Sequence, residues 1–433
     1  DGNPYMEKKQ SSIVPISNEQ KTHRRLTRRR FLGTGIGAGI GAALFTPRFT
    51  WSRLAHQAGA AASQSPAGFY KGMCYSAFPP PYDPSTANQT CIFFGSDIAY
   101  NNMAPLWGAG YTSSSGMTFS GRNDLQTLKG MGVTLVRLYD WEPRNPHLNF
   151  LNYCTQLGIK VLAPVSNYFL RPGQGFEQRE TLIPALIRSY RNAAGTDYHP
   201  AIAGIIMGNE PHLNHFGAAQ CEIFTRDWVR IEQRDFSGFS QPLIGHPVDF
   251  GKRNEQFPAW GFWKSLLEGL KSTATRDLQN RLFLAPQPQN DASYLFENAE
   301  GSGKGYVQQT YAEFQKPLLF TELGHDRTKP NYLNVVDGQL KQSIAYGTQH
   351  PEQLLGICHF QFDDKVWLCP TGGTCPTEGS FGVFSHTNTV LFTVNYVSGD
   401  FTHFDTGPCT NQQLKPDQLT QNPVYNTVVA DYS

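Results

Sequence analysis

Short apolar runs of strand length alternate with longer amphipathic stretches of helix length from about residue 69 to residue 361. Apolar runs bounded by turn residues predict strands, whereas apolar positions three and four residues apart predict helices. The strands are predicted at residues 69–75, 133–139, 158–165, 202–207, 242–246, 281–285, 316–324 and 354–361. The helices are predicted between them, at residues 124–130, 147–157, 180–194, 221–233, 262–278, 304–314 and 334–347. Eight strands that alternate with helices predict an α/β protein with a parallel (β/α)8 barrel of the TIM type, rather than an open doubly wound sheet.

Two segments lie outside the strand-helix repeat. Residues 76–121 form a long loop after the first strand, rich in Pro, Asn and Gly. A loop of that length in a compact domain is usually functional. Residues 376–433 form a short C-terminal extension with alternating apolar and polar positions within residues 390–396. We expect a barrel domain at residues 63–375 and an extension packed on it, either as a small β element over the barrel mouth or along its outside.

The first part of the chain carries an export pattern. Residues 27–33 read Thr-Arg-Arg-Arg-Phe-Leu-Gly and residues 34–45 are glycine-rich and uncharged, which is typical of a twin-arginine signal. The apolar run is shorter than the roughly 20 residues that a membrane-spanning helix needs. Small residues at 58–62 offer a cleavage site. We predict that residues 1–62 are signal and leader, that the residues before Met6 are an expression scar or upstream read-through, and that the mature protein is periplasmic or extracellular. The alternative is the basic start of a surface helix.

Composition narrows the classes of function. The chain has 433 residues, of which 39% are hydrophobic and 16% charged, with a formal net charge of +1. These values allow a large core and show no bias toward nucleic acid or an anionic membrane surface. Aromatic residues make up 13% of the chain, and Trp and Tyr on loops form flat apolar platforms that suit the faces of sugar rings. The glycines at 33–37 follow no predicted strand, which argues against a nucleotide site.

The cysteines fit an exported protein. None of the eight forms a CxxC pair or lies near a His cluster of zinc-ligand spacing, so disulfides are favoured over a metal site. Cys369 and Cys375 flank a turn-rich loop that a local bridge would close, and Cys74 with Cys91 is a second option. The pairing stays open, because cysteines such as Cys358, in a predicted strand, and Cys154, in a predicted helix, fit equally well as buried free thiols.

Two carboxyl groups follow apolar strands. The run Ile202–Met207 leads through Gly208 into Asn209 and Glu210, and a second run within residues 316–324 leads into Glu322. The carboxyl ends of the strands are where parallel α/β barrels place their chemistry. A single strand-end Glu is more often a structural hydrogen-bond acceptor. Two carboxyl groups from separate strands are what cleavage of a glycosidic bond requires, so the pair favours catalysis.

A family resemblance rests on three segments and their order. The segments at residues 133–140, 158–167 and 206–210, together with Glu322, resemble the retaining glycoside hydrolases built on the eight-fold α/β barrel. Within that clan, the chain from about residue 69 to residue 361 is most similar to β-1,3-glucanases and fungal cell-wall β-glucanosyltransferases. Two features differ from the family. Pro211 stands where those enzymes usually have Val, and the sixth strand ends without the tyrosine expected beside the nucleophile.

The resemblance implies roles for the strand-end residues. Glu210 would be the acid/base, with a pKa raised by burial and by the second carboxylate, and Glu322 would be the nucleophile. Asn209 would bind the sugar 2-hydroxyl group. Arg137 would keep Glu322 ionised, or else form an ion pair with Asp140 at its own strand end.

Further residues are candidates for substrate binding. Tyr139 and Asn167 lie at strand ends near the proposed pair. His246 supports the site or is a structural histidine, and Trp367 is a stacking floor for a sugar or an apolar anchor for its loop. Asp140 and Asp326 are the substitute carboxylates if the Glu assignment fails.

These features together predict an exported retaining glycoside hydrolase that cleaves a β-linked glucan, with β-1,3 linkage favoured, through a glycosyl-enzyme intermediate. The alternatives are a β-glucan transglycosylase with the same pair, and a carbohydrate-binding pseudoenzyme, against which the presence of both carboxyl groups argues. The sequence shows no cluster of cofactor ligands, which argues against an exported redox protein. We expect a monomer with a polysaccharide or oligosaccharide substrate, no cofactor, no metal, no nucleic acid partner and no membrane contact after signal removal.

Overall fold

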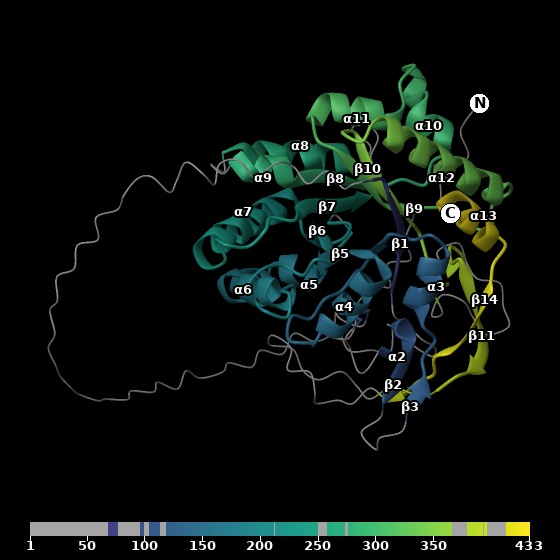
Figure 1. Cartoon of the computed structure of the whole chain (residues 1–433). Coiled ribbons are helices and arrows are strands. Elements are labelled where there is room, and N and C mark those ends of the chain that lie inside the picture. Colours follow the sequence, from purple (N-terminus) through teal and green to yellow (C-terminus); the bar gives the residue numbers. More distant parts are fainter. Residues whose placement is uncertain are drawn as a thin grey trace, which may run out of the picture. The chain divides into compact units, whose positions relative to one another are not determined.

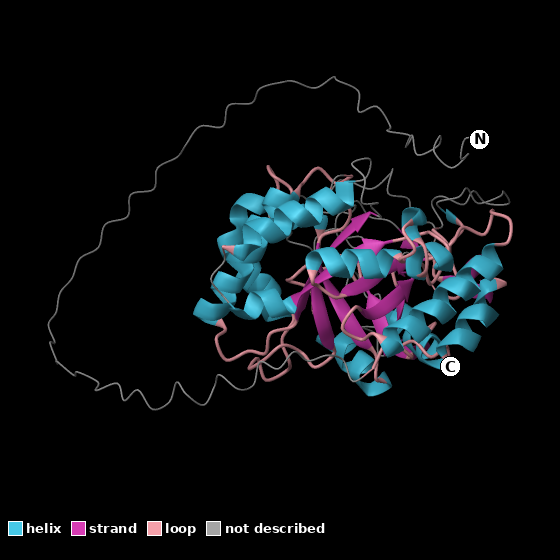
Figure 2. Cartoon of the chain, turned by 90° about the horizontal axis from the view of Figure 1, so that it is seen from above, coloured by secondary structure: helices cyan, strands magenta, loops and turns pink. Residues whose placement is uncertain are grey.

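The computed structural model describes residues 68–76, 96–98, 104–112, 118–211, 213–249, 258–272, 276–365, 379–392, 394–395 and 413–433. Eight parallel strands close into a barrel in the order β1-β10-β9-β8-β7-β6-β5-β4, with helices arranged around it (Figures 1 and 2). The barrel strands are β1 (Tyr70–Cys74), β4 (Leu135–Arg137), β5 (Lys160–Val165), β6 (Ile202–Met207), β7 (Leu243–Asp249), β8 (Leu282–Gln287), β9 (Leu318–Leu323) and β10 (Leu354–His359). The predicted (β/α)8 barrel is confirmed.

The helices largely follow the predicted ranges. They are α2 (Ala104–Trp107), α3 (Asp124–Gly130), α4 (Leu148–Leu157), α5 (Asn167–Leu170), α6 (Arg179–Ser189), α7 (Ala218–Asp235), α8 (Pro258–Lys271), α9 (Arg276–Arg281), α10 (Ala292–Phe296), α11 (Tyr306–Phe314), α12 (Tyr332–Gln349) and α13 (Val424–Tyr432), with short 3-10 helices at Phe176–Gln178 and Ala299–Gly301. The helix predicted at residues 180–194 ends earlier, because the chain turns after Tyr190, whose hydroxyl donates to the Pro164 carbonyl oxygen at 2.6 Å. The single helix predicted at residues 262–278 is wrong, since α8 and α9 divide that segment.

Strand alternation divides the apolar residues into two layers. One set fills the barrel interior and includes Leu135, Leu162, Ile206 and Phe283, while a larger set packs between the strands and the surrounding helices. Gly245 on β7 shows how closely the interior is packed. A Cβ atom at that position would lie 2.2 Å from the Phe283 ring. The Phe283 ring therefore occupies the space that a side chain at position 245 would need.

The C-terminal extension contains both strands and a helix. Strand β11 (Phe384–Val390) pairs antiparallel with β14 (Asp417–Gln421), and β12 (Val394–Asn395) pairs with β13 (Gln413–Leu414). Helix α13 packs against α12 (Figure 1), and the Tyr432 hydroxyl donates to the Gly72 carbonyl oxygen of β1 at 2.8 Å. The sequence analysis missed this helix, although Val424, Val428 and Tyr432 recur at helical spacing and are buried.

The long loop after β1 contributes to the core. It carries α2 and the hairpin of β2 (Gly110–Thr112) and β3 (Thr118–Ser120). Trp107 is buried there and donates from its indole nitrogen to the Ile98 carbonyl oxygen at 2.8 Å. The described part of this loop is therefore packed structure.

The described cysteines are free and buried. They are Cys74, Cys154, Cys221 and Cys358. The Cys74 thiol donates to the Thr321 carbonyl oxygen at 3.1 Å inside the barrel, so the suggested Cys74–Cys91 bridge is wrong for this structure. Cys91, Cys369, Cys375 and Cys409 lie outside the described residues, as does the predicted export segment at 1–62.

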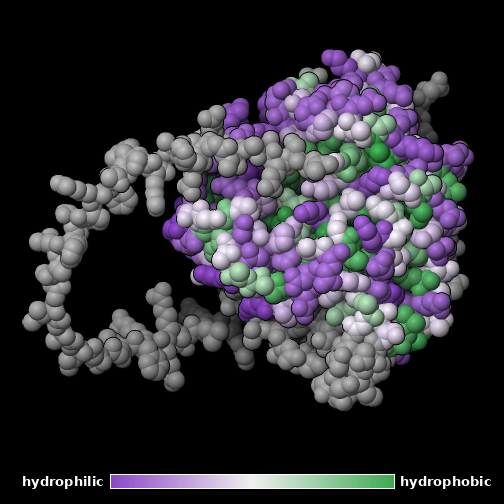
Figure 3. Space-filling view, viewed as in Figure 1, coloured by the Kyte–Doolittle hydropathy of each residue, from purple (hydrophilic) through white to green (hydrophobic). Residues whose placement is uncertain are grey.

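Figure 3 shows the hydropathy of the residues on one face of the molecule. On the face shown in Figure 3, hydrophobic residues form several small separate groups among hydrophilic ones. None of the helices in the described part of the chain is long and apolar enough to cross a membrane.

Candidate active site

Glu322 at the end of β9 is held by three donors through one oxygen. Its Oε1 accepts hydrogen bonds from Arg137 Nη1 at 2.9 Å, the Tyr139 hydroxyl at 3.0 Å and Gln287 Nε2 at 3.0 Å. No described residue donates to Oε2. The carboxylate is thus fixed in orientation through Oε1, while Oε2 is left for another partner.

Arg137 provides the positive charge of the site. The guanidinium is fully buried, lies 3.5 Å from the centroid of the Tyr139 ring, and donates from Nη2 to Asn209 Oδ1 at 2.6 Å. Burial lowers the pKa of Arg137, but Tyr139 and Glu322 raise it above its ordinary value, so the charge is retained. The alternative ion pair with Asp140 is not formed, and Asp140 instead accepts hydrogen bonds from the backbone and hydroxyl of Ser96.

Asn209 connects the two carboxyl groups. Its Oδ1 accepts from Arg137 Nη2 and from Gln287 Nε2, each at 2.6 Å, and its Nδ2 donates to Glu210 Oε2 at 3.3 Å. Because Arg137 has only donors, these contacts also fix which end of the Asn209 amide is oxygen. The Asn209 backbone N–H donates to Asn167 Oδ1 at 2.7 Å, so Asn167 supports the turn.

Glu210 follows β6 through a turn in which Gly208 and Glu210 have left-handed backbone conformations. Gly208 has φ +71° and Glu210 has φ +44°, a region that residues other than glycine seldom occupy. A Cβ atom on Gly208 would lie 2.6 Å from Leu170 Cδ1 and 2.7 Å from Phe216 Cζ, so that position requires glycine. The Glu210 N–H donates to the Pro247 carbonyl oxygen at 3.1 Å, which holds the turn against β7. A non-glycine residue in this conformation is typical of functional sites.

Glu210 has the electrostatics of a proton donor. Burial raises its pKa to about 8, with further contributions from Glu322 and Asp249 that outweigh the lowering by Arg137 and Lys365. The carboxyl group is therefore protonated at neutral pH. Glu322, in contrast, contacts a buried guanidinium at 2.9 Å. Two carboxyl groups in such different surroundings are suited to separate acid and nucleophile roles.

Some predicted site residues lie elsewhere. The His246 side chain is buried against α7, with Nε2 3.0 Å from Thr225 Oγ1, and burial lowers the pKa of its ring to about 3. The structure thus does not bring His246 to the carboxyl pair. Asp326 accepts from the hydroxyl groups of Thr328 and Ser380, apart from the pair. Trp367 lies outside the described residues.

Gln287 is the site residue that the sequence analysis overlooked. It ends β8, inside the segment noted for lacking a tyrosine, and its side chain contacts both Glu322 and Asn209. Tyr139 supplies a phenol to Glu322 from the end of β4 instead. The position of Gln287 at a strand end was a usable signal for its place in the site.

The described residues contain no group of three or more His, Cys, Asp or Glu side chains able to hold a metal ion. The site consists of carboxyl, amide, phenol and guanidinium groups, which are chemically able to form hydrogen bonds with an uncharged polyhydroxyl ligand.

Comparisons with known proteins give the following similarities. No family model matches the chain, and no curated protein matches it. It is similar to the solved structure of Gas2p from Saccharomyces cerevisiae in complex with laminaripentaose, with a TM-score of 0.43 and 14% identity over 85% of this chain and 65% of that chain. A variant of Gas2p without ligand has a TM-score of 0.48 and 13% identity over 85% of this chain and 61% of that chain.

The chain thus spans less than two thirds of the length of these Gas2p chains. The likeness concerns the fold, which the strand order of the chain itself already establishes. The barrel fold that the resemblance implied is confirmed by this strand order.

Proposed function

We propose that the chain is an exported retaining glycoside hydrolase that acts on a β-linked glucan. The observation that carries the proposal is the contrast between the two carboxyl groups. Glu322 has one oxygen held by three donors, including a buried guanidinium, whereas burial raises the pKa of Glu210 to about 8. Such a pair, presented at the carboxyl ends of β6 and β9, can act as proton donor and nucleophile on opposite sides of one glycosidic bond.

The first step forms a covalent glycosyl-enzyme. Glu322 Oε2 forms a bond to the anomeric carbon as the bond from that carbon to the glycosidic oxygen breaks. Glu210 transfers its proton to the departing oxygen, which leaves as a hydroxyl group. The Oε1 donors hold Glu322 in position, so little reorganisation accompanies the attack.

The second step releases the sugar. Glu210, now a carboxylate, removes a proton from water, and the water oxygen bonds to the anomeric carbon as the ester bond to Glu322 breaks. Two displacements at one carbon retain its configuration. A sugar hydroxyl in place of water would give transglycosylation with the same residues, so this alternative is an outcome of the test.

The substrate class and location come from the sequence. The resemblance of residues 133–140, 158–167 and 206–210 supports β-1,3-glucan as the substrate, and the twin-arginine-type pattern supports a periplasmic or extracellular location. We further propose residues 63–375 as the catalytic domain, with the segment from residue 376 onward as an extension of it. Laminaripentaose, the ligand of one Gas2p structure, is a suitable first oligosaccharide to test.

The test is product analysis by chromatography after incubation with β-1,3-glucan, β-1,4-glucan or mannan. Shorter products from one polymer identify hydrolysis and its linkage, while products longer than added laminaripentaose identify transfer. Proton NMR of the first product should show the β-anomer, because retention is expected. Glu322→Gln is the inactive control. Binding of a polymer without any product would contradict the proposal and favour a carbohydrate-binding pseudoenzyme.

A further inference from the structure

Gln287 carries a buried amide oxygen that no described residue satisfies. The residue is 3% exposed, and its Oε1 has no hydrogen-bond partner within the described part of the chain. A buried acceptor is normally paired, and an unpaired one at a functional site requires an explanation. The Nε2 atom of the same amide contacts Glu322 and Asn209, so the unpaired oxygen belongs to the site itself.

The orientation of this amide follows from its neighbours. Arg137 can only donate, so the Asn209 atom that contacts it is the oxygen. The Gln287 atom that contacts this oxygen and the Glu322 carboxylate must therefore be the nitrogen. Both amide hydrogens of Gln287 are then used, and the free capacity of the side chain is purely that of an acceptor.

The neighbouring acceptors are already occupied. Glu322 Oε1 accepts from three donors, and Asn209 Oδ1 accepts from two. Glu322 Oε2 is the oxygen that reacts under the proposed function. Among the side chains of Glu322, Asn209 and Gln287, one acceptor is therefore left for a sugar hydroxyl, the Gln287 Oε1 atom. The hydroxyl also finds one donor, Asn209 Nδ2, whose contact with Glu210 is 3.3 Å long.

We propose that Gln287 determines specificity by accepting a hydrogen bond from the 2-hydroxyl group of the sugar whose anomeric carbon reacts. This inference rests on the proposed function. Asn209 Nδ2 donates to the same hydroxyl, so that the group is bound through both its proton and its oxygen. Sugars with a hydrogen in place of this hydroxyl leave the Gln287 oxygen unpaired and are disfavoured.

The experiment compares two substrates in three proteins. The substrates are an aryl β-laminaribioside and its analogue without the 2-hydroxyl on the reacting ring, and the proteins are the unsubstituted chain, Gln287→Met and Tyr139→Phe. Gln287→Met removes the acceptor and also two donor contacts. The lost contact with Glu322 affects both substrates alike and cancels in the ratio of their kcat/KM values, while Asn209, which loses the other contact, is still held by Arg137 Nη2 at 2.6 Å. Tyr139→Phe is the matched control, because it removes one donor to Glu322 Oε1 and leaves the Gln287 oxygen in place.

We expect Gln287→Met to reduce the preference for the hydroxyl-bearing substrate by about 10- to 100-fold and Tyr139→Phe to leave that preference unchanged. If Gln287→Met does not fold, Gln287→Leu takes its place. Affinities of the non-reacting disaccharides for the Glu322→Gln protein, with and without Gln287→Met, give the same comparison without turnover.

An unchanged preference in the Gln287 variant, with normal turnover by the unsubstituted chain, overturns this inference alone. Absence of both turnover and binding for both sugars overturns the proposed function, and this inference fails with it.

Discussion

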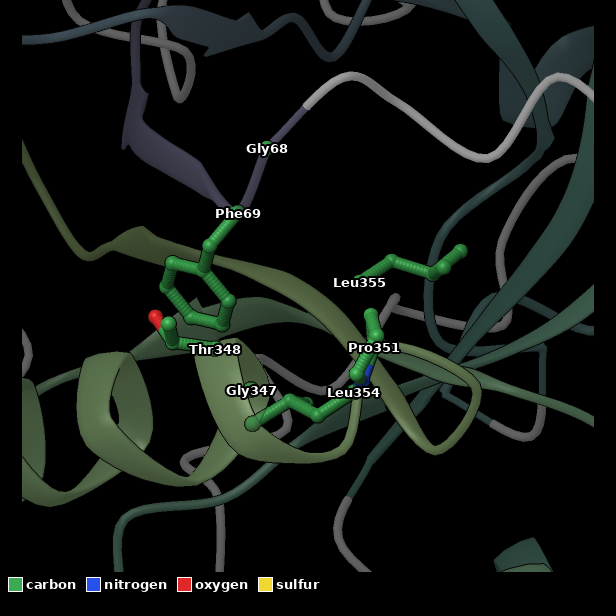
Figure 4. A pocket seen from close by; sticks show the side chains of 7 residues that line it. All are labelled: Gly68, Phe69, Gly347, Thr348, Pro351, Leu354 and Leu355. Carbon is green, nitrogen blue, oxygen red and sulfur yellow. The ribbon is translucent and has the colours of Figure 1, made fainter.

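At the carboxyl end of the barrel strands, Arg137 and Gln287 both donate to the Glu322 carboxylate and to Asn209 Oδ1, so most of the polar atoms there are paired with one another. At the amino end lies a hollow of about 290 Å³, lined by Phe69, Leu354 and other mainly apolar residues (Figure 4). The hollow contains none of the residues of the candidate site. The candidate site is therefore defined by convergent polar side chains and a raised carboxyl pKa, and not by this hollow.

The difference follows from the geometry of a parallel barrel. Successive strands deliver the first residues of their following loops to one end, where polar groups from separated parts of the sequence meet. The other end receives the residues that precede each strand. There the helix α12 and the start of β10 pack closely enough that Gly347 has no room for a side chain beside the Phe69 ring. Substitutions at the two ends should accordingly affect turnover and stability separately.

The largest effect is expected at the nucleophile. Glu322→Gln keeps the size of the side chain and an acceptor for the three donors, but an amide cannot form the glycosyl ester, so turnover should fall by at least about four orders of magnitude. Initial rates on laminaripentaose would measure this, and calorimetry should show that binding is retained. A rate within about tenfold of the unsubstituted chain would remove Glu322 from the mechanism.

Glu210→Ala should cost roughly two to four orders of magnitude on natural substrates, because the departing oxygen loses its proton donor. The effect should be much smaller for an aryl glycoside with an acidic phenol, which leaves without protonation. The folded pKa of Glu210 is raised to about 8, so the donor is present below that value and is lost as the pH rises through it. The alkaline decline in kcat/KM, which reports the free enzyme, should therefore centre near pH 8 and disappear in the variant; a decline that persists would assign it to another group.

Tyr139→Phe tests the fixing of Glu322. The change removes one of three hydrogen bonds to Oε1 and keeps the ring beneath the Arg137 guanidinium. We expect kcat to fall by about 10- to 100-fold, because a carboxylate held by two donors is less precisely placed for attack. The free energy of unfolding should fall by up to about 1.5–3 kcal/mol, the contribution of a hydrogen bond to a charged group. Unchanged kcat would mean that Arg137 and Gln287 suffice to hold the carboxylate.

Gly347→Ala tests the amino end. The new Cβ atom would lie 2.2 Å from the Phe69 ring, so repacking should destabilise the fold by about 1–3 kcal/mol and leave kcat unaltered. Gly338→Ala on the same helix is the control, because its nearest neighbour is 3.7 Å away and alanine favours a helix by up to about 1 kcal/mol. Urea unfolding would measure both. A loss of turnover in folded Gly347→Ala would show that the two ends are coupled.

The positions of the strands in the sequence and the carboxyl pair were predictable because both depend on local pattern. Apolar runs gave the positions of all eight barrel strands, and Glu210 and Glu322 follow two of them. Of the two alternatives for His246, the structure has the structural one, and the local pattern indicates it. His246 alternates in phase with Ile244 and Val248, which pack between strands and helices, and so it faces α7.

Gln287 was harder to find, because its role depends on neighbours in space. Its contact with Glu322 requires the side-by-side arrangement of β8 and β9 at their carboxyl ends, which no local pattern specifies. Helix α13 was missed for a different reason. Its three buried residues give a helical pattern, but the sequence analysis considered only the alternation at 390–396, and so predicted either a small β element or a segment along the outside of the barrel.

The contacts of α13 have a consequence for biosynthesis. Strand β1 pairs with β10, and its Lys71 ammonium donates to the Tyr432 carbonyl oxygen at 2.6 Å across 361 positions of sequence. Strand β1 is therefore synthesised long before β10 and α13, the elements that complete its surroundings. Until β10 has been synthesised, the β1 edge that β10 covers is open to pairing with other chains. Stalled or prematurely ended translation should thus yield aggregation-prone chains, even where every catalytic residue has already been synthesised.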